Sequence, residues 1–407
     1  MRLIRRLIAA LLVPLIIVVA ATVATVGALI LTPPGHGLLA RVATEWISGA
    51  VAGSLHIGAI RGNIWNHIEL DDVVVRDLRD SVVLSTPRLE ASYLLLGLLA
   101  RRLVFRRVRA DSLQLHLVKL RAGQWNYEAV FHLGEGPGSG RPPPNVAFTD
   151  LRITDASVQI DVPTTPGPPH RAASRNGRPP AQPRIDIGVD GPVRVYTASR
   201  LDAVLPLLRI STPRHDPLLA RIASMRATLN DPQLRITQLA GQIITAGDSL
   251  RFTFDSAALP ATRLKGGGAV RWPHDTLLFD FTLDAPRVAL RDLWWIQPDL
   301  PDWQGRGHVI AKSFNGSRAD FKLDNLVLGD RRASVTGKVT VMTDRVRGVG
   351  MGALDMQLRN TPIDVLRPYL DTLPVSGTLT GHLLANGFLD SLRLGGDLVF
   401  ADALVAG

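Results

Sequence analysis

The sequence contains no cysteine, and this absence removes several classes of protein from consideration. A disulfide scaffold, a thiolate zinc site and a cysteine nucleophile are all excluded. Aromatic residues make up only 5% of the 407 residues, whereas there are 36 glycines and 28 prolines. This balance indicates many turns and few large aromatic cores, which is typical of β structure. With 46% hydrophobic residues, the chain is too apolar to be disordered and long enough for two or three domains or one elongated body.

The sequence also lacks the common catalytic and cofactor-binding signatures. Its ten histidines are too widely spaced for an HxH or HExxH metal motif. There is no Walker A lysine, no dinucleotide-binding fingerprint and no GxSxG elbow, and Gly266–Gly268 precedes an expected strand rather than a helix. We therefore predict no catalytic residue, no metal site and no cofactor, and we expect that the protein is not an enzyme.

One long apolar run lies near the amino terminus. Leu7–Leu31 has no charged side chain, and as a helix it would be about 37 Å long, enough to cross a hydrocarbon core of ~30 Å. Arginines at positions 2, 5 and 6 precede it, so the positive-inside rule places residues 1–6 in the cytoplasm and exports the rest. We predict a single uncleaved signal anchor, and a cleaved signal peptide is the alternative.

The segment after this run has apolar residues at helical spacing. It predicts an amphipathic helix that lies against the membrane or, as an equally weighted alternative, caps a core. The residues that form the stripe are Leu38, Leu39, Val42, Trp46, Ile47 and Val51.

Beyond residue 56 the dominant hydrophobic period is two. Phe252 and Phe254, for example, alternate with polar residues, as do Phe321 and Leu323. This pattern predicts antiparallel sheet, and helices are expected only near 91–101, 200–208, 288–297 and 363–370. Because so few helices cannot cover such a sheet, its apolar faces must meet in a sandwich or barrel, or line a groove filled by something apolar.

A repeat near the carboxyl end supports an array of similar units. Leu290, Gly305 and His308 have counterparts in Leu366, Gly377 and His382, and the shared position favours a structural role for the two histidines. The predicted organisation is 1–6 cytoplasmic tail, 7–31 anchor, 32–56 amphipathic helix, 57–133 amino-terminal β/helix unit, 134–184 β segment with two Pro/Gly-rich loops, 185–285 β-sheet segment, 286–361 first repeat unit and 362–407 second, incomplete repeat unit.

A basic cluster follows the leucine-rich stretch Leu94–Leu99. Only Phe105 is interleaved with its arginines, so the stacking aromatics that a nucleic-acid site needs are missing. Next to an apolar helix of an anchored, exported protein, the cluster predicts contact with anionic membrane head groups. The alternative is a polar helix end followed by strand faces exposed to water. The cluster consists of Arg101, Arg102, Arg106, Arg107 and Arg109.

Three stretches resemble the AsmA-like superfamily and, within it, the TamB-type envelope proteins. They are Gly62–Asp77 after the anchor, Pro87–Leu120 with its strand, leucine-rich helix and strands, and the repeat-like Leu366–Ala403. The resemblance implies a mainly β fold, in which an amino-terminal transmembrane helix precedes an elongated, twisted antiparallel β-sheet groove with a few short helices. TamB-type chains are usually far longer, so we expect either a fragment or a short member.

The resemblance also implies a function. We expect an inner-membrane protein with its bulk in the periplasm, acting in outer-membrane biogenesis through phospholipid transfer or outer-membrane protein assembly. The expected partners are phospholipid acyl chains, the inner membrane and an Omp85-class outer-membrane protein, and no nucleic acid. A structural factor with a closed, dry β-sandwich that recruits an outer-membrane partner is the alternative. Residues expected to line the groove, unless they are ordinary packed core, are Phe252, Phe254, Phe279, Phe281, Leu283, Phe321 and Leu323.

Overall fold

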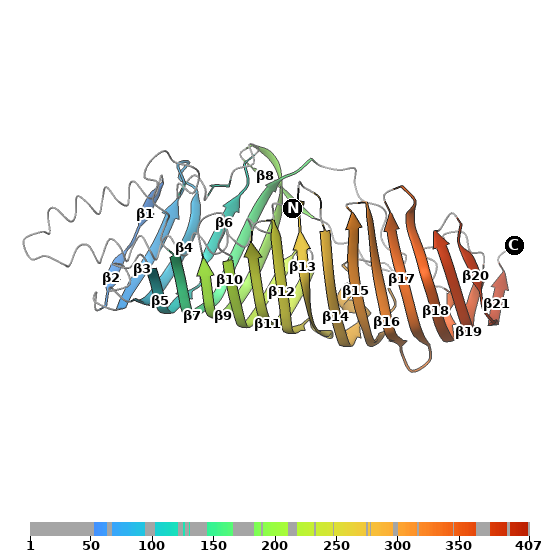
Figure 1. Ribbon diagram of the computed structural model, residues 1–407. Coiled ribbons are helices and arrows are strands. Elements are labelled where there is room, and N and C mark those ends of the chain that lie inside the picture. The colour runs from blue at the N-terminus through green and yellow to red at the C-terminus, as the bar shows by residue number, and fades with distance from the viewer. Residues whose placement is uncertain are drawn as a thin grey trace, which may run out of the picture. The chain divides into compact units, whose positions relative to one another are not determined.

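The fold is described here from a computed structural model (Figure 1). It describes residues 53–62, 67–93, 102–120, 125–126, 130, 145–165, 183–188, 190–210, 218–231, 233–246, 248–273, 276, 278–295, 300–315, 317–344, 346–363, 375–388 and 391–405.

The described chain is mainly β-strand and divides into two compact units that meet at residues 247–248. We call them the amino-terminal and carboxyl-terminal units. The strands of the amino-terminal unit are β1 (Ser54–His56), β2 (Ala59–Arg61), β3 (His67–Arg76), β4 (Val82–Tyr93), β5 (Arg102–Asp111), β6 (Gln114–Val118), β7 (Asn145–Pro163), β8 (Arg184–Gly188), β9 (Gly191–Ile210), β10 (Leu218–Asn230) and β11 (Gln233–Ala246).

The carboxyl-terminal unit holds the remaining strands and a 3-10 turn, Leu290–Leu293, between β14 and β15. Its strands are β12 (Ser249–Ala258), β13 (Arg263–Arg271), β14 (Leu278–Ala289), β15 (Gln304–Asn315), β16 (Arg318–Gly329), β17 (Ser334–Asp344), β18 (Gly348–Pro362), β19 (Val375–Phe388), β20 (Arg393–Gly395) and β21 (Leu398–Val405).

The amino-terminal unit has a mixed sheet. β3 pairs with the short β1 and β2 on one side and with β4 on the other. β4 is followed by β5 and β6, which both pair with β7 in parallel. β7, β9, β10 and β11 continue antiparallel, and β8 forms a hairpin with the start of β9. The parallel pairings require the chain to cross between β6 and β7, a route that a two-residue hairpin cannot make.

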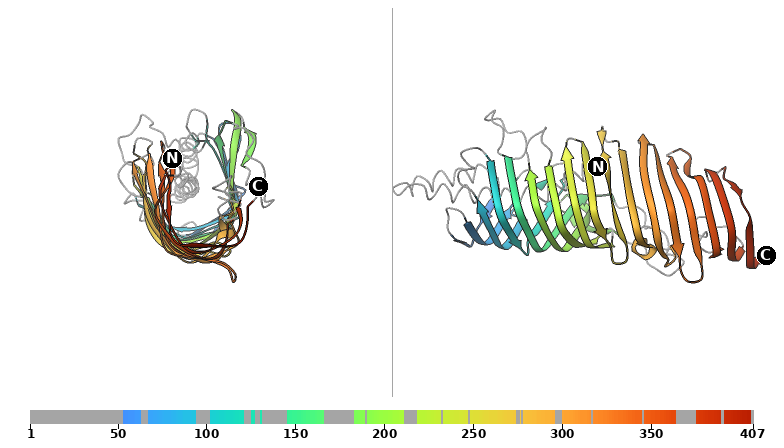
Figure 2. Two further views of the ribbon diagram at one scale, coloured as in Figure 1. Left: turned by 90° about the vertical axis from the view of Figure 1, so that its right-hand side faces the viewer. Right: turned by 60° about the horizontal axis from the view of Figure 1, so that its bottom comes forward.

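The carboxyl-terminal unit is a plain antiparallel meander from β12 to β19, and β19 then pairs with both β20 and β21. Each pairing from β12–β13 to β18–β19 contains a register shift, such as the one between Leu323 and Leu326. β-bulges bend a strand and increase its twist. The strands of this unit accordingly curve along their length (Figure 2, orange to red).

The core of the amino-terminal unit is fully closed from solvent. The rings of Phe105 on β5 and Phe148 on β7 stack with centroids 5.2 Å apart, and both side chains are 0% exposed. Trp125 and Val130, from the chain between β6 and β7, are also 0% exposed. The amide of Asn126 secures this connection, since its side-chain oxygen accepts from the Val118 N–H and its nitrogen donates to a strand carbonyl.

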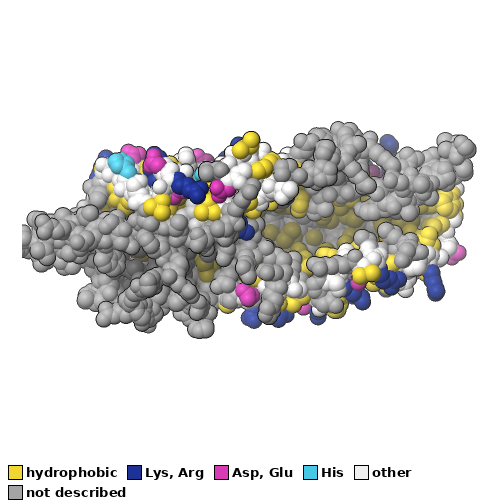
Figure 3. Space-filling model, turned by 90° about the horizontal axis from the view of Figure 1, so that it is seen from above, with side chains coloured by type: hydrophobic (Ala, Val, Ile, Leu, Met, Phe, Trp, Pro, Cys, Tyr) yellow, Lys and Arg dark blue, Asp and Glu magenta, His cyan; other side chains and the backbone are white. Residues whose placement is uncertain are grey.

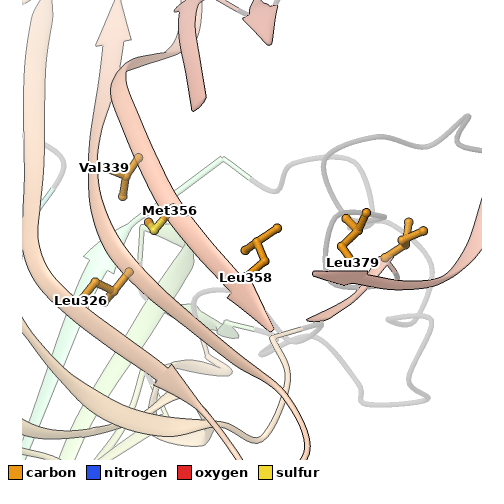
Figure 4. Close-up of a cluster of buried hydrophobic side chains, with 6 residues drawn as sticks. Leu326, Val339, Met356, Leu358 and Leu379 are labelled. Atoms are coloured by element: carbon orange, nitrogen blue, oxygen red, sulfur yellow. The ribbon is translucent and has the colours of Figure 1, made fainter. Parts of the chain in front are cut away.

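The carboxyl-terminal unit has smaller buried clusters. Figure 4 shows one, in which side chains from β16, β17, β18 and β19 converge: Leu326, Val339, Met356, Leu358 and Leu379, joined by Ile363. A second forms where the 3-10 turn packs on the sheet, with Leu290, Trp303 and Ala333.

Two helix predictions fail or shrink in the structure. Residues 200–208 form part of β9, which pairs with β7 on one side and β10 on the other, so sheet pairing overrides the helical spacing of Leu201, Val204, Leu205 and Leu208. Of the predicted helix 288–297, residues 288–289 belong to β14, Leu290–Leu293 form the 3-10 turn, and residues 296–297 lie outside the described residues. β4 continues to Tyr93, into the predicted helix 91–101, and its remainder up to residue 101 lies outside the described residues, as do residues 364–370.

The predicted membrane anchor, Leu7–Leu31, also lies outside the described residues. Within the part that is described, no helix has the length and apolar character needed to cross a membrane. The last three residues of the predicted amphipathic helix 32–56 form strand β1, because they pair with β3. Most of the two Pro/Gly-rich loops (134–144 and 163–183) is likewise outside the described residues.

Candidate functional site

The seven residues predicted to line a groove lie on one face of the carboxyl-terminal sheet. The strand register places Phe252, Phe281 and Phe321 in one row, in which they are separated by Gly268 on β13 and Ala311 on β15. A second row contains Phe254, Leu283 and Leu323, separated by Gly266 and Val309.

The seventh residue, Phe279, lies on β14 two positions before Phe281 and therefore on the same face. Its ring links strands, because its centroid is 5.7 Å from Phe281 on its own strand and 5.7 Å from Phe321 on β16. On β12, the rings of Phe252 and Phe254 lie 4.9 Å apart. The phenylalanines therefore form a continuous aromatic surface, which we call the phenylalanine face.

Glycines of β13 allow this surface to form. A Cβ at Gly268 would lie 2.3 Å from the Phe281 Cβ and 2.5 Å from the Asp280 carbonyl oxygen, so no larger residue fits without moving the strands. With no side chain between them, Phe252 and Phe281 approach across β13 to a centroid distance of 6.4 Å. Edge-tilted rings at such distances attract one another beyond their shared apolar burial.

The phenylalanine face is only partly covered. All seven predicted residues are half-buried, in contrast with the closed core of the other unit. Figure 3 shows hydrophobic side chains gathered in the hollowed face of the carboxyl-terminal strands, between rims that carry charged groups. A sizeable apolar surface left half-open can bind an apolar ligand, since burial of each further CH₂ stabilises by about 0.8 kcal/mol.

The opposite face of the same strands is polar and carries several lysine–aspartate pairs. Thr253 and Thr282, which alternate with the phenylalanines, are exposed. Such surface pairs contribute little to stability. The lysine–aspartate pairs and their N–O distances are Lys265–Asp284 (3.7 Å), Lys312–Asp280 (3.7 Å), Lys322–Asp324 (2.8 Å) and Lys338–Asp355 (3.6 Å).

The two histidines of the repeat lie on strands. His382 on β19 contacts Asp355 on β18 with Nε2 and Oδ1 2.8 Å apart, and this hydrogen bond lowers the pKa of Asp355, with a smaller contribution from Lys338. His308 on β15 lies opposite Asp324 on β16 and Asp284 on β14. Among the described residues, no group of three histidine, aspartate or glutamate side chains is arranged to hold a metal ion.

The predicted basic cluster falls on β5. Arg106, Arg107 and Arg109 are exposed, and Arg109 Nη1 lies 3.7 Å from the carboxylate of Glu90. Arg102 begins the strand, and its side chain is outside the described residues, as is all of Arg101.

Sequence reasoning did not place the small residues that complete the phenylalanine face. Gly266, Gly268 and Ala311 sit between the large side chains of neighbouring strands. The signal was present in the run of three glycines within an otherwise alternating segment, which is unusual in a strand interior. Its meaning depends on the strand register, which the sequence alone did not give.

Comparisons of the chain with family models, with curated proteins and with solved structures found no match.

Proposed function

We propose that this protein is a non-enzymatic, membrane-anchored lipid carrier of the cell envelope, whose phenylalanine face holds phospholipid acyl chains. The proposed architecture is a membrane helix followed by an elongated β-sheet groove. The observation that carries the proposal is the half-buried row Phe252, Phe281 and Phe321 on a curved sheet with a polar outer face.

The chemistry of this face fits an acyl chain better than a polar substrate. Its rows consist of phenylalanine, leucine, valine, alanine and glycine, with no charged side chain in register. An acyl chain that lies along such a surface gains of order 10 kcal/mol from apolar burial. Because the surface is apolar along several strands, the ligand is able to slide along it without breaking hydrogen bonds.

The resemblance to AsmA-like and TamB-type proteins supports the same assignment and suggests its setting. It places the anchor Leu7–Leu31 in the inner membrane, the remainder in the periplasm, and the activity in outer-membrane biogenesis. Phospholipid transfer between membranes is the proposed role. Assembly of outer-membrane proteins with an Omp85-class partner is the second candidate, since the same half-open apolar face is able to shield the apolar side of a nascent strand.

Site-specific photocrosslinking in cells tests the proposal. A photoreactive residue in place of Phe254 or Phe281 is expected to capture phospholipid, whereas the same residue in place of Thr253 or Thr282 on the opposite face is not. Equal lipid capture from both faces rejects the carrier function. Capture of outer-membrane protein segments instead of lipid from Phe254 and Phe281 supports the assembly role.

A further inference from the structure

A second surface, on the other unit, carries an excess of positive charge. The outer face of the amino-terminal sheet, opposite the Phe105–Phe148 core, presents exposed arginines from five strands. Register places Arg106 on β5, Thr149 on β7, Leu207 on β9 and Arg221 on β10 in one row across this face. We call the following set the arginine surface: Arg106, Arg107, Arg109, Arg152, Arg200, Arg221, Arg226 and Arg235.

Many of these charges are not neutralised. Arg106, Arg107, Arg221 and Arg235 form no ion pair with any residue of the described chain. Arg109 lies directly opposite Arg152 in the parallel pairing of β5 with β7. Like charges in opposed positions destabilise a sheet, and here Glu90 beside Arg109 and Asp150 beside Arg152 offset part of that repulsion.

The arginine surface contains two adjoining hollows. The first, of about 470 Å³, is lined by Arg152, Arg226, Thr154 and Ser224, and the second, of about 500 Å³, includes Arg200 and Arg235 with further threonines. Guanidinium groups offer paired N–H donors that match the geometry of a phosphate, and the neighbouring hydroxyl groups add donors. Asp202 bonds to Arg226 and Asp150 to Arg152, so both arginines of the first hollow lie beside a carboxylate, whereas Arg200 and Arg235 of the second form no ion pair with a described residue.

In the sequence, the excess of basic over acidic residues lies before residue 247. Residues 54–246 contain 24 lysines and arginines against 17 acidic residues, whereas residues 248–407 contain 18 of each. In the carboxyl-terminal unit the four outer-face lysines all lie beside aspartates. An uncompensated positive surface attracts an anionic partner, and its effect decays over a Debye length of about 8 Å at physiological salt.

We propose that the arginine surface docks on the anionic phospholipid head groups of the membrane that anchors the chain. This inference rests on the anchoring in the proposed function, not on the phenylalanine face. Only residues 32–53 separate the apolar run from β1, so the arginine-bearing unit starts at most roughly 75 Å along the chain from the bilayer. Tethering at this distance keeps the head groups at high effective concentration.

The test uses the full chain reconstituted into vesicles of phosphatidylcholine with or without phosphatidylglycerol. Because the chain has no cysteine, Ala223→Cys, between Arg221 and Arg226 on β10, provides one labelling site, and Thr253→Cys on the carboxyl-terminal unit provides the control. Energy transfer from the label to an acceptor on the lipid head groups is expected to rise with phosphatidylglycerol for Ala223→Cys, and by more than for Thr253→Cys, because only Ala223 lies on the proposed docking face. The same transfer is expected to fall as salt is raised.

Charge removal sharpens the test. The double variant Arg106→Gln and Arg221→Gln is expected to weaken lipid-dependent docking by roughly 25-fold, because each arginine near an anionic surface contributes roughly fivefold. The matched control, Lys265→Gln with Lys322→Gln, is expected to leave docking unchanged. An energy transfer that does not change with phosphatidylglycerol overturns the proposal, and so does one that the arginine substitutions leave unaltered. These are the results expected if the partner of the arginine surface is an acidic protein and not a membrane. Retention on vesicles after carbonate extraction reports the anchor separately, so a wild-type chain that is retained but does not dock refutes this inference alone.

Discussion

The two units bury their large apolar side chains to different extents, although both are built from long curved strands. In the amino-terminal unit Phe105 and Phe148 are stacked and fully enclosed. In the carboxyl-terminal unit Phe252, Phe281 and Phe321 make ring contacts but stay half-open. The described connections of the two sheets also differ, because the chain crosses between the parallel-paired β6 and β7 in the first unit and buries Trp125 and Val130 there, whereas β12 to β18 of the second follow one another as an antiparallel meander.

The charged residues of the two units differ less sharply. The amino-terminal unit has exposed arginines with no ion-pair partner among the described residues, and the four lysines of the carboxyl-terminal unit each lie beside an aspartate, although Arg251 and Arg271 of that unit are exposed without such a partner. We assign the apolar surface to acyl chains and the arginine surface to head groups, which are the two halves of a phospholipid.

The largest expected effect comes from breaking the closed core. Phe148→Ala removes a fully buried ring and is expected to destabilise the amino-terminal unit by about 3–5 kcal/mol. Hydrogen exchange measured by mass spectrometry across a denaturant series resolves the strands of each unit. Protection of β5, β7 and β9 is expected to fall while that of β14–β18 is unchanged, and a uniform loss in both units would contradict independent cores.

Filling the gap between the phenylalanines is expected to have the next largest effect. Gly268→Val places a side chain where a Cβ already meets Phe281 and the Asp280 carbonyl, and it is expected to cost about 1–3 kcal/mol in the carboxyl-terminal unit. Gly395→Ala is the matched control, since its Cβ would meet only the Leu384 Cβ at 4.0 Å. Equal hydrogen-exchange protection of β12–β14 in the two variants would contradict the close packing inferred across β13.

Opening the phenylalanine face further is expected to have a small effect on stability. Phe281→Ala removes a half-buried ring and is expected to cost about 1 kcal/mol, far less than Phe148→Ala. Lipid capture from a photoreactive residue at position 254 is nevertheless expected to fall. A destabilisation as large as that of Phe148→Ala would show that the face is an ordinary packed core.

The smallest expected difference between the two units is in how much stability each loses at low pH. Hydrogen bonds lower the pKa values of Asp330, Asp344 and Asp355 in the carboxyl-terminal unit and of Asp202 in the other. A lowered carboxyl pKa stabilises the fold above the unfolded value near about 4, and this contribution is lost as the pH falls through the folded value. Hydrogen exchange at about pH 3, corrected for intrinsic rates, is expected to loosen β16–β19 before β9–β10.

Asp355→Asn provides the control for this pH dependence, because it removes the carboxylate that His382 contacts. The variant is expected to lose less protection in β18 and β19 between about pH 5 and pH 3 than the wild type. An identical acid response in the variant would exclude this pair as a source of the effect.

The sequence predicted most of the strands but not their partners. Alternation of Phe279, Phe281 and Leu283 with polar residues requires only local information, and the structure confirms these strands. Residues 200–208 were misassigned because Leu201, Val204, Leu205 and Leu208 satisfy a helical spacing, and only their pairing with β7 and β10 makes them a strand.

Register also decides which residues share a site. The common face of Phe252, Phe281 and Phe321 follows from pairings between strands, with Gly268 and Ala311 as spacers. The arginine surface was visible in the sequence only at β5, because its other members are scattered between residues 152 and 235. Arrangement in space, rather than residue type, was the missing information.

The phospholipid content of the purified chain tests the central claim most directly. We predict that the wild-type protein carries bound phospholipid, measured by native mass spectrometry after detergent extraction, and that Phe281→Asp loses it. Thr282→Asp, which places the same charge on the opposite face of β14, is expected to retain it. Equal lipid content in all three proteins, with the fold of each verified by hydrogen exchange, would contradict a lipid-binding role for the phenylalanine face.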